Sequence, residues 1–267
     1  MTNSIHPTAI VEPGVTLGSN VVIGPYCVLQ GPVKIGDNVE LKSHVVIEGH
    51  TTIGAGTRIY SFAVLGAPTP DRKYKGEAAE LIIGKNNVIR EYVTMHPGTA
   101  ADKMKTVVGD NNLILERVHI AHDCVIGNNV TLVNSVGISG HVTIEDFVTI
   151  GGMTGVTQHV RIGHHAFIGA HVKLEEDVIP YGLVRGDHGY LDGVNIIGMQ
   201  RQNMTDANIK AARKAYLYIF NRAEGTTFAE RVEEAAKEYA NTPAVMEIIE
   251  FIRNRERALC QPRALAA

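Results

Sequence analysis

The chain has 267 residues, which is enough for one large domain or for a domain with an appendage. Hydrophobic residues make up 45% and charged residues 20%, as in ordinary globular proteins, and the net charge of -3 gives no reason to expect nucleic acid or an anionic membrane as a partner. The sequence starts without a basic segment followed by an apolar one, and no apolar stretch approaches the ~20 residues that cross a bilayer. We therefore expect a cytoplasmic protein without integral membrane association.

The first structural signal is a period of six residues. Every sixth residue from Ile5 to Leu65 is a large aliphatic residue, and the residue four places later, from Ala9 to Ala63, is small or β-branched. Such a hexapeptide repeat is typical of a parallel β-helix, in which each hexad forms one short strand and a turn. The aliphatic side chain points into the core and the small one fills the space near the corner. Independent strands of a sandwich would not keep this phase.

The repeat is interrupted twice, and we expect a charged loop at each interruption. The first loop covers about 67–80 and is predicted to replace two hexads without shifting the phase; the second covers about 97–107. A repeat protein that extrudes a charged loop usually does so for function. The repeat then restarts one residue out of step at Val108 and continues to Leu174, with Asn112 as the one small position that departs from the pattern.

The composition changes near residue 186, which divides the chain into a β-helix over 1–186 and a C-terminal helical domain over 187–267. Directly after the repeat we expect irregular chain, in the segment GDHGYLDGVNIIG. Three helices are predicted beyond it, over 205–222, 227–240 and 243–258. Thr205 and Thr242 are the expected N-caps of the first and third helices, and Pro243 suits a first helical position.

The three cysteines form neither a disulfide framework nor a zinc pattern, because their number is odd and their spacing wide. Cys27 and Cys124 fall on the small interior position of the repeat. We expect both to fill the core rather than to act as nucleophiles.

Histidines cluster in the second half of the repeat. Hexapeptide repeats are known as left-handed β-helices with three hexads in each coil, so residues about eighteen apart stack at one strand spacing, about 4.8 Å. One outward edge is therefore predicted to carry two columns, His122, Gly140 and Gln158, and beside them Asp123, His141 and His159. An exposed corner tolerates a lone histidine without any function. That explanation suits HIAHDC less well, because the motif holds two histidines with an aspartate beside the second.

Two chemistries suit this edge. In the first, His122 is a general base, since a neutral imidazole can take a proton from a sugar hydroxyl near neutral pH. Asp123 would orient the ring, and the backbone N–H of Gly140 would stabilise an oxyanion. In the second, the histidines bind zinc, as in the hexapeptide-repeat carbonic anhydrases, whose ligands come from two neighbouring chains. Spacing alone leaves both possibilities open.

Several motifs together resemble one family over nearly the whole chain and in the same order. They are HIAHDC at 119–124, SGH at 139–141, IGGMTGVTQ at 150–158, DRKYKGE at 71–77 and GVNIIGMQR at 193–201. With the helical tail, they look like the UDP-N-acetylglucosamine 3-O-acyltransferases of lipid A biosynthesis. Generic hexads are shared by many enzymes, whereas HIAHDC combined with this loop and tail is specific.

The resemblance implies a left-handed β-helix and an activity. The enzyme would transfer a 3-hydroxyacyl chain from an acyl carrier protein thioester to the 3-hydroxyl of UDP-N-acetylglucosamine, the first step of lipid A synthesis. It would be a homotrimer with active sites between neighbouring chains. It would need no metal and no cofactor, because the carrier protein brings its own phosphopantetheine. The main alternatives are the same transfer to a 3-amino sugar nucleotide, the zinc lyase, a sugar N-acetyltransferase that uses acetyl-CoA, and a non-catalytic scaffold.

The resemblance also assigns roles to residues. His122 would be the base, Asp123 its partner and Gly140 the oxyanion donor. The sugar pocket would be lined by Asp71, Lys73, His119, His141 and Gln158, and the uridine diphosphate would be held by Asn195 and Arg201. Basic residues that could dock the acidic carrier protein are Arg161, Lys173, Arg185, Lys210, Arg213 and Lys214.

The chain departs from the family pattern at three positions. Thr157 stands where the family often has histidine, Ile197 where it often has a carboxylate, and Gln202 where a second basic residue commonly follows. These departures bear on the nucleotide and sugar contacts and leave the 3-amino sugar open. Ala170, near the expected end of the acyl groove, favours a long acyl chain, although His171 lies beside it.

Overall fold

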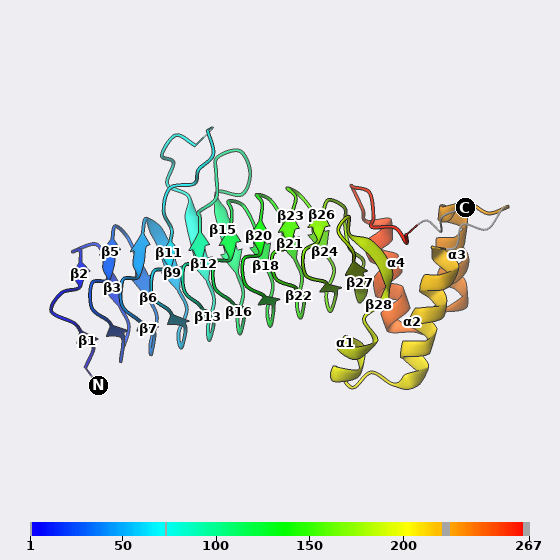
Figure 1. Cartoon of the computed structure of the whole chain (residues 1–267), viewed down its shortest axis with the longest axis horizontal. Helices are drawn as coiled ribbons and strands as arrows, with labels where there is room; N and C mark the ends of the chain where they lie inside the picture. Colours follow the sequence, from blue (N-terminus) through cyan, green and yellow to red (C-terminus); the bar gives the residue numbers. More distant parts are fainter. Residues whose placement is uncertain (1, 73, 221–224, 264–267) are drawn as a thin grey trace.

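The protein is described here by a computed structural model that covers residues 2–72, 74–220 and 225–263. Figure 1 shows a long left-handed β-helix that starts at the N-terminus and ends against a group of helices. Three sheets form its faces, and each coil contributes one strand to each sheet in turn.

Sheet A contains β1 (Ser4–Ile5), β4 (Val22–Ile23), β7 (Glu40–Leu41), β10 (Arg58–Ile59), β13 (Val88–Ile89), β16 (Leu113–Ile114), β19 (Thr131–Leu132), β22 (Thr149–Ile150), β25 (Phe167–Ile168), β27 (Gly182–Arg185) and β28 (Tyr190–Val194). Sheet B contains β2 (Ile10–Val11), β5 (Val28–Gln30), β8 (Val46–Glu48), β11 (Val64–Leu65), β14 (Thr94–Met95), β17 (His119–Ile120), β20 (Gly137–Ile138), β23 (Gly155–Val156) and β26 (Lys173–Leu174). Sheet C contains β3 (Thr16–Leu17), β6 (Lys34–Ile35), β9 (His50–Ile53), β12 (Glu80–Ile83), β15 (Lys105–Val108), β18 (Val125–Ile126), β21 (Thr143–Ile144) and β24 (Arg161–Ile162).

The interior follows the predicted period. Aliphatic positions such as Ile47 and Ile120 are fully buried, and so are Cys27 and Cys124 on the small position. Burial raises the pKa of the Cys124 thiol to about 12, so this side chain fills the core as predicted. Ile5 is an exception with 45% of its surface exposed, because it belongs to the first coil and no earlier coil covers it.

Asn112 departs from the repeat because it belongs to a polar ladder inside the core. Its N–H donates to the side chain of Asn87 at 2.8 Å, and its own Oδ1 accepts from the N–H of Val130 at 2.7 Å. Below it, Thr57 accepts from the N–H of Asn87 at 3.2 Å. Each buried polar side chain thus satisfies a backbone group of the next coil, which makes its burial tolerable.

Most corners turn at a residue with positive φ, one place before the small core residue. Asn38 and Asn129 occupy this position with φ of 57° and 56°, as their residue type predicts. Asp123, His141 and His159 occupy it too, with φ of 58°, 65° and 64°. The second column of the histidine edge is therefore made of residues held in the left-handed region by the coil itself.

Both loops leave the β-helix at the corner between sheets B and C, on the upper side in Figure 1. The first connects β11 to β12 and the second connects β14 to β15. The prediction that the first loop replaces two hexads is wrong. Leu65 pairs with Met95, and Ile53 with Ile83, so no face is skipped and the loop is an insertion. The second loop is shorter than predicted, because β15 begins at Lys105 and pairs with β12.

The segment after residue 186 is not irregular as predicted. β27 and β28 form an antiparallel hairpin that ends the β-helix, and α1 (Ile196–Arg201) follows. Their short lengths and scattered glycines gave no periodic signal. The division of the chain at residue 186 stays a prediction.

The three predicted helices exist with shorter bounds. They are α2 (Asp206–Ile219), α3 (Phe228–Glu238) and α4 (Pro243–Arg253). Predicted positions 221 and 222 lie outside the described residues. Thr205 caps α2 as expected, whereas the Thr242 side chain makes no cap hydrogen bond. The chain after α4 is extended rather than helical because Leu259 pairs with Asp177 of the β-helix. Among the described residues, no helix is long and apolar enough to cross a membrane.

Candidate active site

The histidine edge lies at the same corner as the two loops, between sheets B and C. The N–H of His141 donates to the carbonyl of His122 at 3.0 Å, and that of His159 to the carbonyl of Gly140 at 3.2 Å. These bonds confirm the predicted stacking of the two columns. The rings of His141 and His159 stack at 4.4 Å, and the ring of His122 meets that of His141 edge-on at 4.9 Å.

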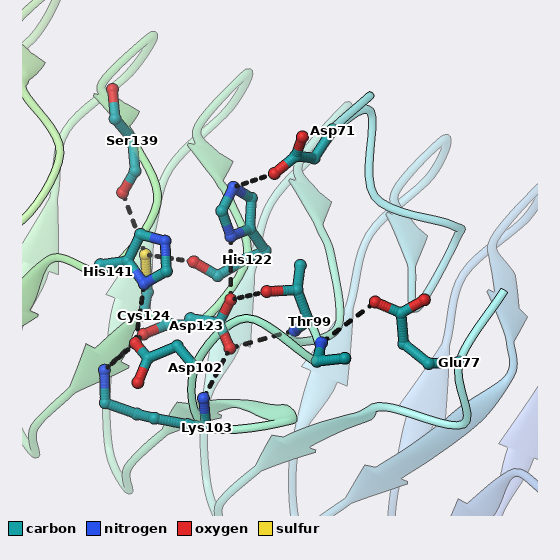
Figure 2. A network of polar contacts seen from close by, with 11 residues as sticks. Asp71, Glu77, Thr99, Asp102, Lys103, His122, Asp123, Cys124, Ser139 and His141 are labelled. Atoms are coloured by element: carbon teal, nitrogen blue, oxygen red, sulfur yellow. Dashed lines mark hydrogen bonds and ion pairs between the residues drawn. The ribbon is translucent and has the colours of Figure 1, made fainter. Parts of the chain in front are cut away.

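His122 and Asp123 form a buried pair. Nδ1 of His122 lies 2.9 Å from Oδ2 of Asp123, and the two residues are 8% and 0% exposed. Asp123 also accepts hydrogen bonds from the N–H and hydroxyl of Thr99 at 3.0 and 2.7 Å and from the N–H of Lys103 at 3.2 Å (Figure 2). A carboxylate that only accepts fixes the proton of the imidazole on Nδ1. Nε2 is then the basic nitrogen.

Nε2 of His122 faces the first loop. The nearest carboxylate oxygen, Oδ2 of Asp71, lies 3.7 Å away, beyond hydrogen-bonding distance (Figure 2). The loop therefore places a second acid on the opposite side of the ring from Asp123. Lys73, predicted beside it, lies outside the described residues.

Gly140 lies one coil from His122 and leaves room for the ring. A Cβ added at Gly140 would come 2.6 Å from Cε1 of His122. Within the described part of the chain, the Gly140 N–H has no hydrogen-bond acceptor. At the equivalent position of another corner, by contrast, the N–H of Asn128 is capped by Oδ1 of Asp146 at 2.7 Å. The Gly140 amide is thus available to a ligand.

These groups line a pocket of about 820 Å³. Its lining residues are Thr69, Pro70, Asp71, Arg72, His119, Ala121, His122, Gly137, Ile138, Ser139, Gly140, Gly155, Val156, Thr157 and Gln158. Asp71, His119 and Gln158, three of the residues predicted to bind the sugar, therefore line one pocket with His122. His141 instead lines the neighbouring groove, where its Nδ1 lies 2.7 Å from Oδ2 of Asp102.

His119 reaches this pocket from β17 with a perturbed ionisation. Burial lowers its pKa, and the nearby ring of His96 adds to the effect. Nδ1 of His119 also lies 2.8 Å from the hydroxyl of Thr94. The neutral imidazole can therefore offer a hydrogen bond to a ligand without adding a charge.

Asn195 and Arg201 lie at another part of the chain, in a second pocket of about 610 Å³. Asn195 caps α1 by accepting from the N–H of Gly198 at 3.0 Å, and its amide donates to the carbonyl of His165 at 2.9 Å. Ile197 and Gln202 line the same pocket. Within one chain, the structure does not bring this pair together with His122.

Sequence reasoning missed several residues of the edge. It marked the second loop as functional but did not single out Thr99, Asp102 or Lys103, because only the fold shows which loop atoms reach Asp123 and His141. It also missed Gly137 and Gly155, at which an added Cβ would meet nothing within 4 Å. Glycine inside a strand is itself a signal that a ligand approaches closely, and it could have found them.

The proposed zinc chemistry has a geometric candidate. Ligand atoms of His122, Asp123 and His141 lie within 4.8 Å of one another. The Asp123 member of this set fits a metal poorly, however, because its carboxylate already accepts four hydrogen bonds and would have to lose some of them to bind zinc. The carboxylates beside Nδ1 of His122 and His141 do not decide the question, since histidines that bind zinc through Nε2 commonly donate their other N–H to a carboxylate.

Comparisons with known proteins show which family the chain is similar to. A family model described as UDP-N-acetylglucosamine O-acyltransferase, domain 2, matches residues 177–260, and the bacterial transferase hexapeptide model matches 32–67 and 105–140. The acyl-(acyl-carrier-protein)–UDP-N-acetylglucosamine O-acyltransferase of Bartonella henselae is 47% identical over 97% of this chain and 94% of its own length. The enzyme of the same name from Rickettsia canadensis is 48% identical over 97% and 98%.

Solved structures give the same result. LpxA of Bacteroides fragilis, a UDP-N-acetylglucosamine acyltransferase, has a TM-score of 0.93 at 35% identity and covers 96% of this chain and 100% of that chain. LpxA of Acinetobacter baumannii has a TM-score of 0.92 at 37% identity, with coverage of 96% and 99%. The resemblance seen in the sequence motifs is confirmed. The chain belongs to the family of acyl-(acyl-carrier-protein)–UDP-N-acetylglucosamine O-acyltransferases.

Proposed function

We propose that the protein transfers a 3-hydroxyacyl chain from the thioester of an acyl carrier protein to the 3-hydroxyl of UDP-N-acetylglucosamine, the first step of lipid A synthesis. The observation that carries this proposal is the pairing of His122 with a buried carboxylate beside the unoccupied amide of Gly140. A base and an oxyanion donor at one pocket are the two groups that direct acyl transfer to a hydroxyl requires. The family membership supplies the substrates.

His122 is the general base in this mechanism. Its Nε2 removes the proton of the sugar hydroxyl while the oxygen attacks the thioester carbon. Asp123 keeps Nδ1 protonated and stabilises the imidazolium that forms. The new ester C–O bond forms and the C–S bond breaks. The imidazolium returns its proton to the leaving sulfur, so the phosphopantetheine thiol is released and His122 is neutral again.

Gly140 supplies the oxyanion donor. As the hydroxyl adds, the thioester oxygen gains negative charge, and a backbone N–H that is already oriented stabilises that charge at little reorganisation cost. Asp71, His119 and Gln158 line the same pocket and are positioned to bind the sugar. His141 contributes from the neighbouring groove, where Asp102 holds its Nδ1.

The nucleotide contacts require a second chain. Asn195 and Arg201 lie in a separate pocket of the same chain, so they can serve His122 only if another copy brings its own Asn195 and Arg201 to this edge. We therefore propose a homotrimer with shared sites, in which Arg201 contacts the diphosphate. Ile197, 63% exposed in the second pocket, leaves no carboxylate there for the ribose or base.

The carrier protein supplies the phosphopantetheine, so we propose that no separate cofactor takes part. Among the basic candidates for docking, Lys210, Arg213 and Lys214 are exposed on α2. Arg161 is a weaker candidate, because its guanidinium stacks on Phe251 and donates to the carbonyl of Asn254 at 2.8 Å. A carrier-protein thioester as donor implies that the protein works in the cytoplasm.

The test combines product analysis with the variant His122→Ala. The protein is mixed with an acyl acceptor, either UDP-N-acetylglucosamine or its 3-amino analogue. The acyl donor is either a ladder of acyl-carrier thioesters or acetyl-CoA, and the products are identified by mass spectrometry. We expect an O-acylated UDP-sugar, and a reduction of kcat by ~100-fold or more in His122→Ala with folding intact. Turnover near the wild-type rate in that variant would remove the mechanism. Activity lost to a chelator, with stoichiometric zinc bound, would favour the lyase instead.

A further inference from the structure

The second loop contacts the catalytic pair of His122 and Asp123 directly, through hydrogen bonds to the Asp123 carboxylate. Every lone-pair direction of the Asp123 carboxylate that is not used by His122 is taken by this loop. The N–H groups of Thr99 and Lys103 both donate to Oδ1, at 3.0 and 3.2 Å. The loop thus binds Asp123 on the sides that the His122 ring leaves free (Figure 2).

The hydroxyl of Thr99 has a special place in this arrangement. It donates to Oδ2 at 2.7 Å, and Oδ2 is also the oxygen that faces Nδ1 of His122 at 2.9 Å. Two donors therefore share one carboxylate oxygen, one from the loop and one from the imidazole. Because the hydroxyl holds Oδ2 and the two amides hold Oδ1, the carboxylate plane is fixed relative to the imidazole ring.

We propose that Thr99 is a positioning residue for acyl transfer, which acts on His122 through Asp123. Its hydroxyl sets the direction in which Oδ2 meets Nδ1 and shares the charge of that oxygen. The second loop then contributes to catalysis and is more than a connection on the surface. This inference rests on the proposed function for its kinetic effect, while its effect on the imidazole can be measured without turnover.

A hydrogen bond also joins the two loops. Oε1 of Glu77 accepts from the N–H of Ala100 at 3.0 Å, next to Thr99, and Oε2 accepts from the N–H of Lys75 at 2.8 Å. These backbone hydrogen bonds lower the pKa of Glu77 and keep it ionised. Glu77 therefore ties the loop that carries Asp71 to the loop that carries Thr99. The acids on both sides of His122 are fixed by one connected unit.

A purely structural role of Thr99 would have different consequences. If its hydroxyl only stabilised the loop, its loss would lower the melting temperature and the amount of active enzyme, but the ionisation of His122 would stay the same. If it shares the charge of Oδ2, its loss leaves more negative charge facing Nδ1. The imidazolium is then favoured and the pKa of His122 rises. The other titratable groups around the ring, Asp71, His119, His141 and Lys103, are unchanged by the substitution.

The experiment compares Thr99→Val with Thr99→Ser, which keeps the hydroxyl. The pH titration of His122 is followed by NMR of its imidazole, assigned by the signal that His122→Ala lacks, and kcat/KM is measured against pH. For Thr99→Val we expect the His122 titration and the acid limb of kcat/KM to move to higher pH, with kcat lowered roughly tenfold. Thr99→Ser should restore both. Thr99→Ala replaces Thr99→Val if the latter fails to fold.

A matched control is Thr57→Val. Thr57 is equally buried, and its hydroxyl donates to the carbonyl of Gly84 at 3.1 Å and accepts from Asn87, far from the histidine edge. It should lower the melting temperature without moving the His122 titration. An unchanged or lowered His122 titration in Thr99→Val would overturn the inference. A moved titration in a protein without any acyltransferase turnover would retain it and reject the proposed function instead.

Discussion

Gly140 lies directly against the imidazole of His122. A Cβ at residue 140 would come 2.6 Å from Cε1 and 2.7 Å from Nε2 of His122, closer than such atoms approach in proteins. Glycine is therefore required at this position, because the His122 ring on the adjacent coil occupies the space that the side chain of any other residue would need. The same absence of a side chain leaves the Gly140 N–H open to the pocket.

We expect Gly140→Ala to reduce kcat on the order of 100-fold, because a displacement of the base by about 1 Å costs that much. The added methyl group must push the imidazole of His122 away from its place beside Asp123. The measurement is steady-state kinetics together with thermal unfolding, which should change little.

A double-mutant cycle shows whether the effect acts through the base. In a His122→Ala background, Gly140→Ala should have almost no further effect on kcat, because no ring remains to be displaced. Additive losses in the double variant would show that the two residues do not interact as the structure indicates.

Asp123→Asn tests the role of the buried carboxylate. An amide nitrogen in place of Oδ2 would donate to Nδ1 of His122, so the imidazole proton would move to Nε2 and the base would be lost. We expect kcat to fall by at least ~100-fold with little change in KM for the sugar nucleotide. Because Thr99 and Lys103 also donate to this group, the variant should be less stable as well. A large rise in KM with unchanged kcat would contradict the assignment.

The sequence predicted the histidine edge because its register follows from arithmetic. A fixed hexad and three hexads per coil place residues 122, 140 and 158 on one corner, and the hydrogen bonds between His141 and His122 and between His159 and Gly140 confirm it. The same regularity placed the core and explains why Asn112 stood out. Where the sequence keeps a short period, the position of one residue predicts which residues lie beside it on the adjacent coils.

The loops and the end of the β-helix could not be predicted in this way. Thr99 reaches Asp123 through the path of an insertion that has no period, so no pattern relates the two positions. The hairpin of β27 and β28 and the extended chain around Leu259 form because each covers an open edge of the last coils. The contact of Leu259 with Asp177 joins segments far apart in sequence, and the hairpin is too short and too rich in glycine to give a periodic signal.

His165 gives the stability of the protein a predictable pH dependence. Its ring stacks against Phe147 at 4.7 Å and Tyr181 at 5.4 Å, and burial, followed by the charge of His164, lowers its pKa. The unfolded chain therefore binds a proton more readily than the folded one. Stability is complete above the ordinary histidine pKa of ~6.5 and falls as the pH drops from there toward the lowered value.

The substitution His165→Phe should flatten this dependence. Phenylalanine keeps the stacking and does not titrate, although it gives up the contact of Nδ1 with Nδ1 of His164 at 2.9 Å. We expect the urea midpoint of the variant to decrease less than that of the wild type between about pH 8 and pH 5. Parallel decreases in the two proteins would assign the pH dependence to other groups.

Hybrid trimers test whether the site is shared between chains. His122 and Arg201 lie in separate pockets of one chain, so the proposed site takes each from a different copy. His122→Ala removes the proposed base and Arg201→Ala removes the proposed diphosphate contact, and each variant alone should be nearly inactive. When the two variants are unfolded, mixed and refolded together, some sites receive an intact His122 from one chain and an intact Arg201 from its neighbour. These sites should regain turnover that neither parent has. If both residues served the same site from the same chain, every site in the mixture would still lack one of them, and mixing would restore nothing.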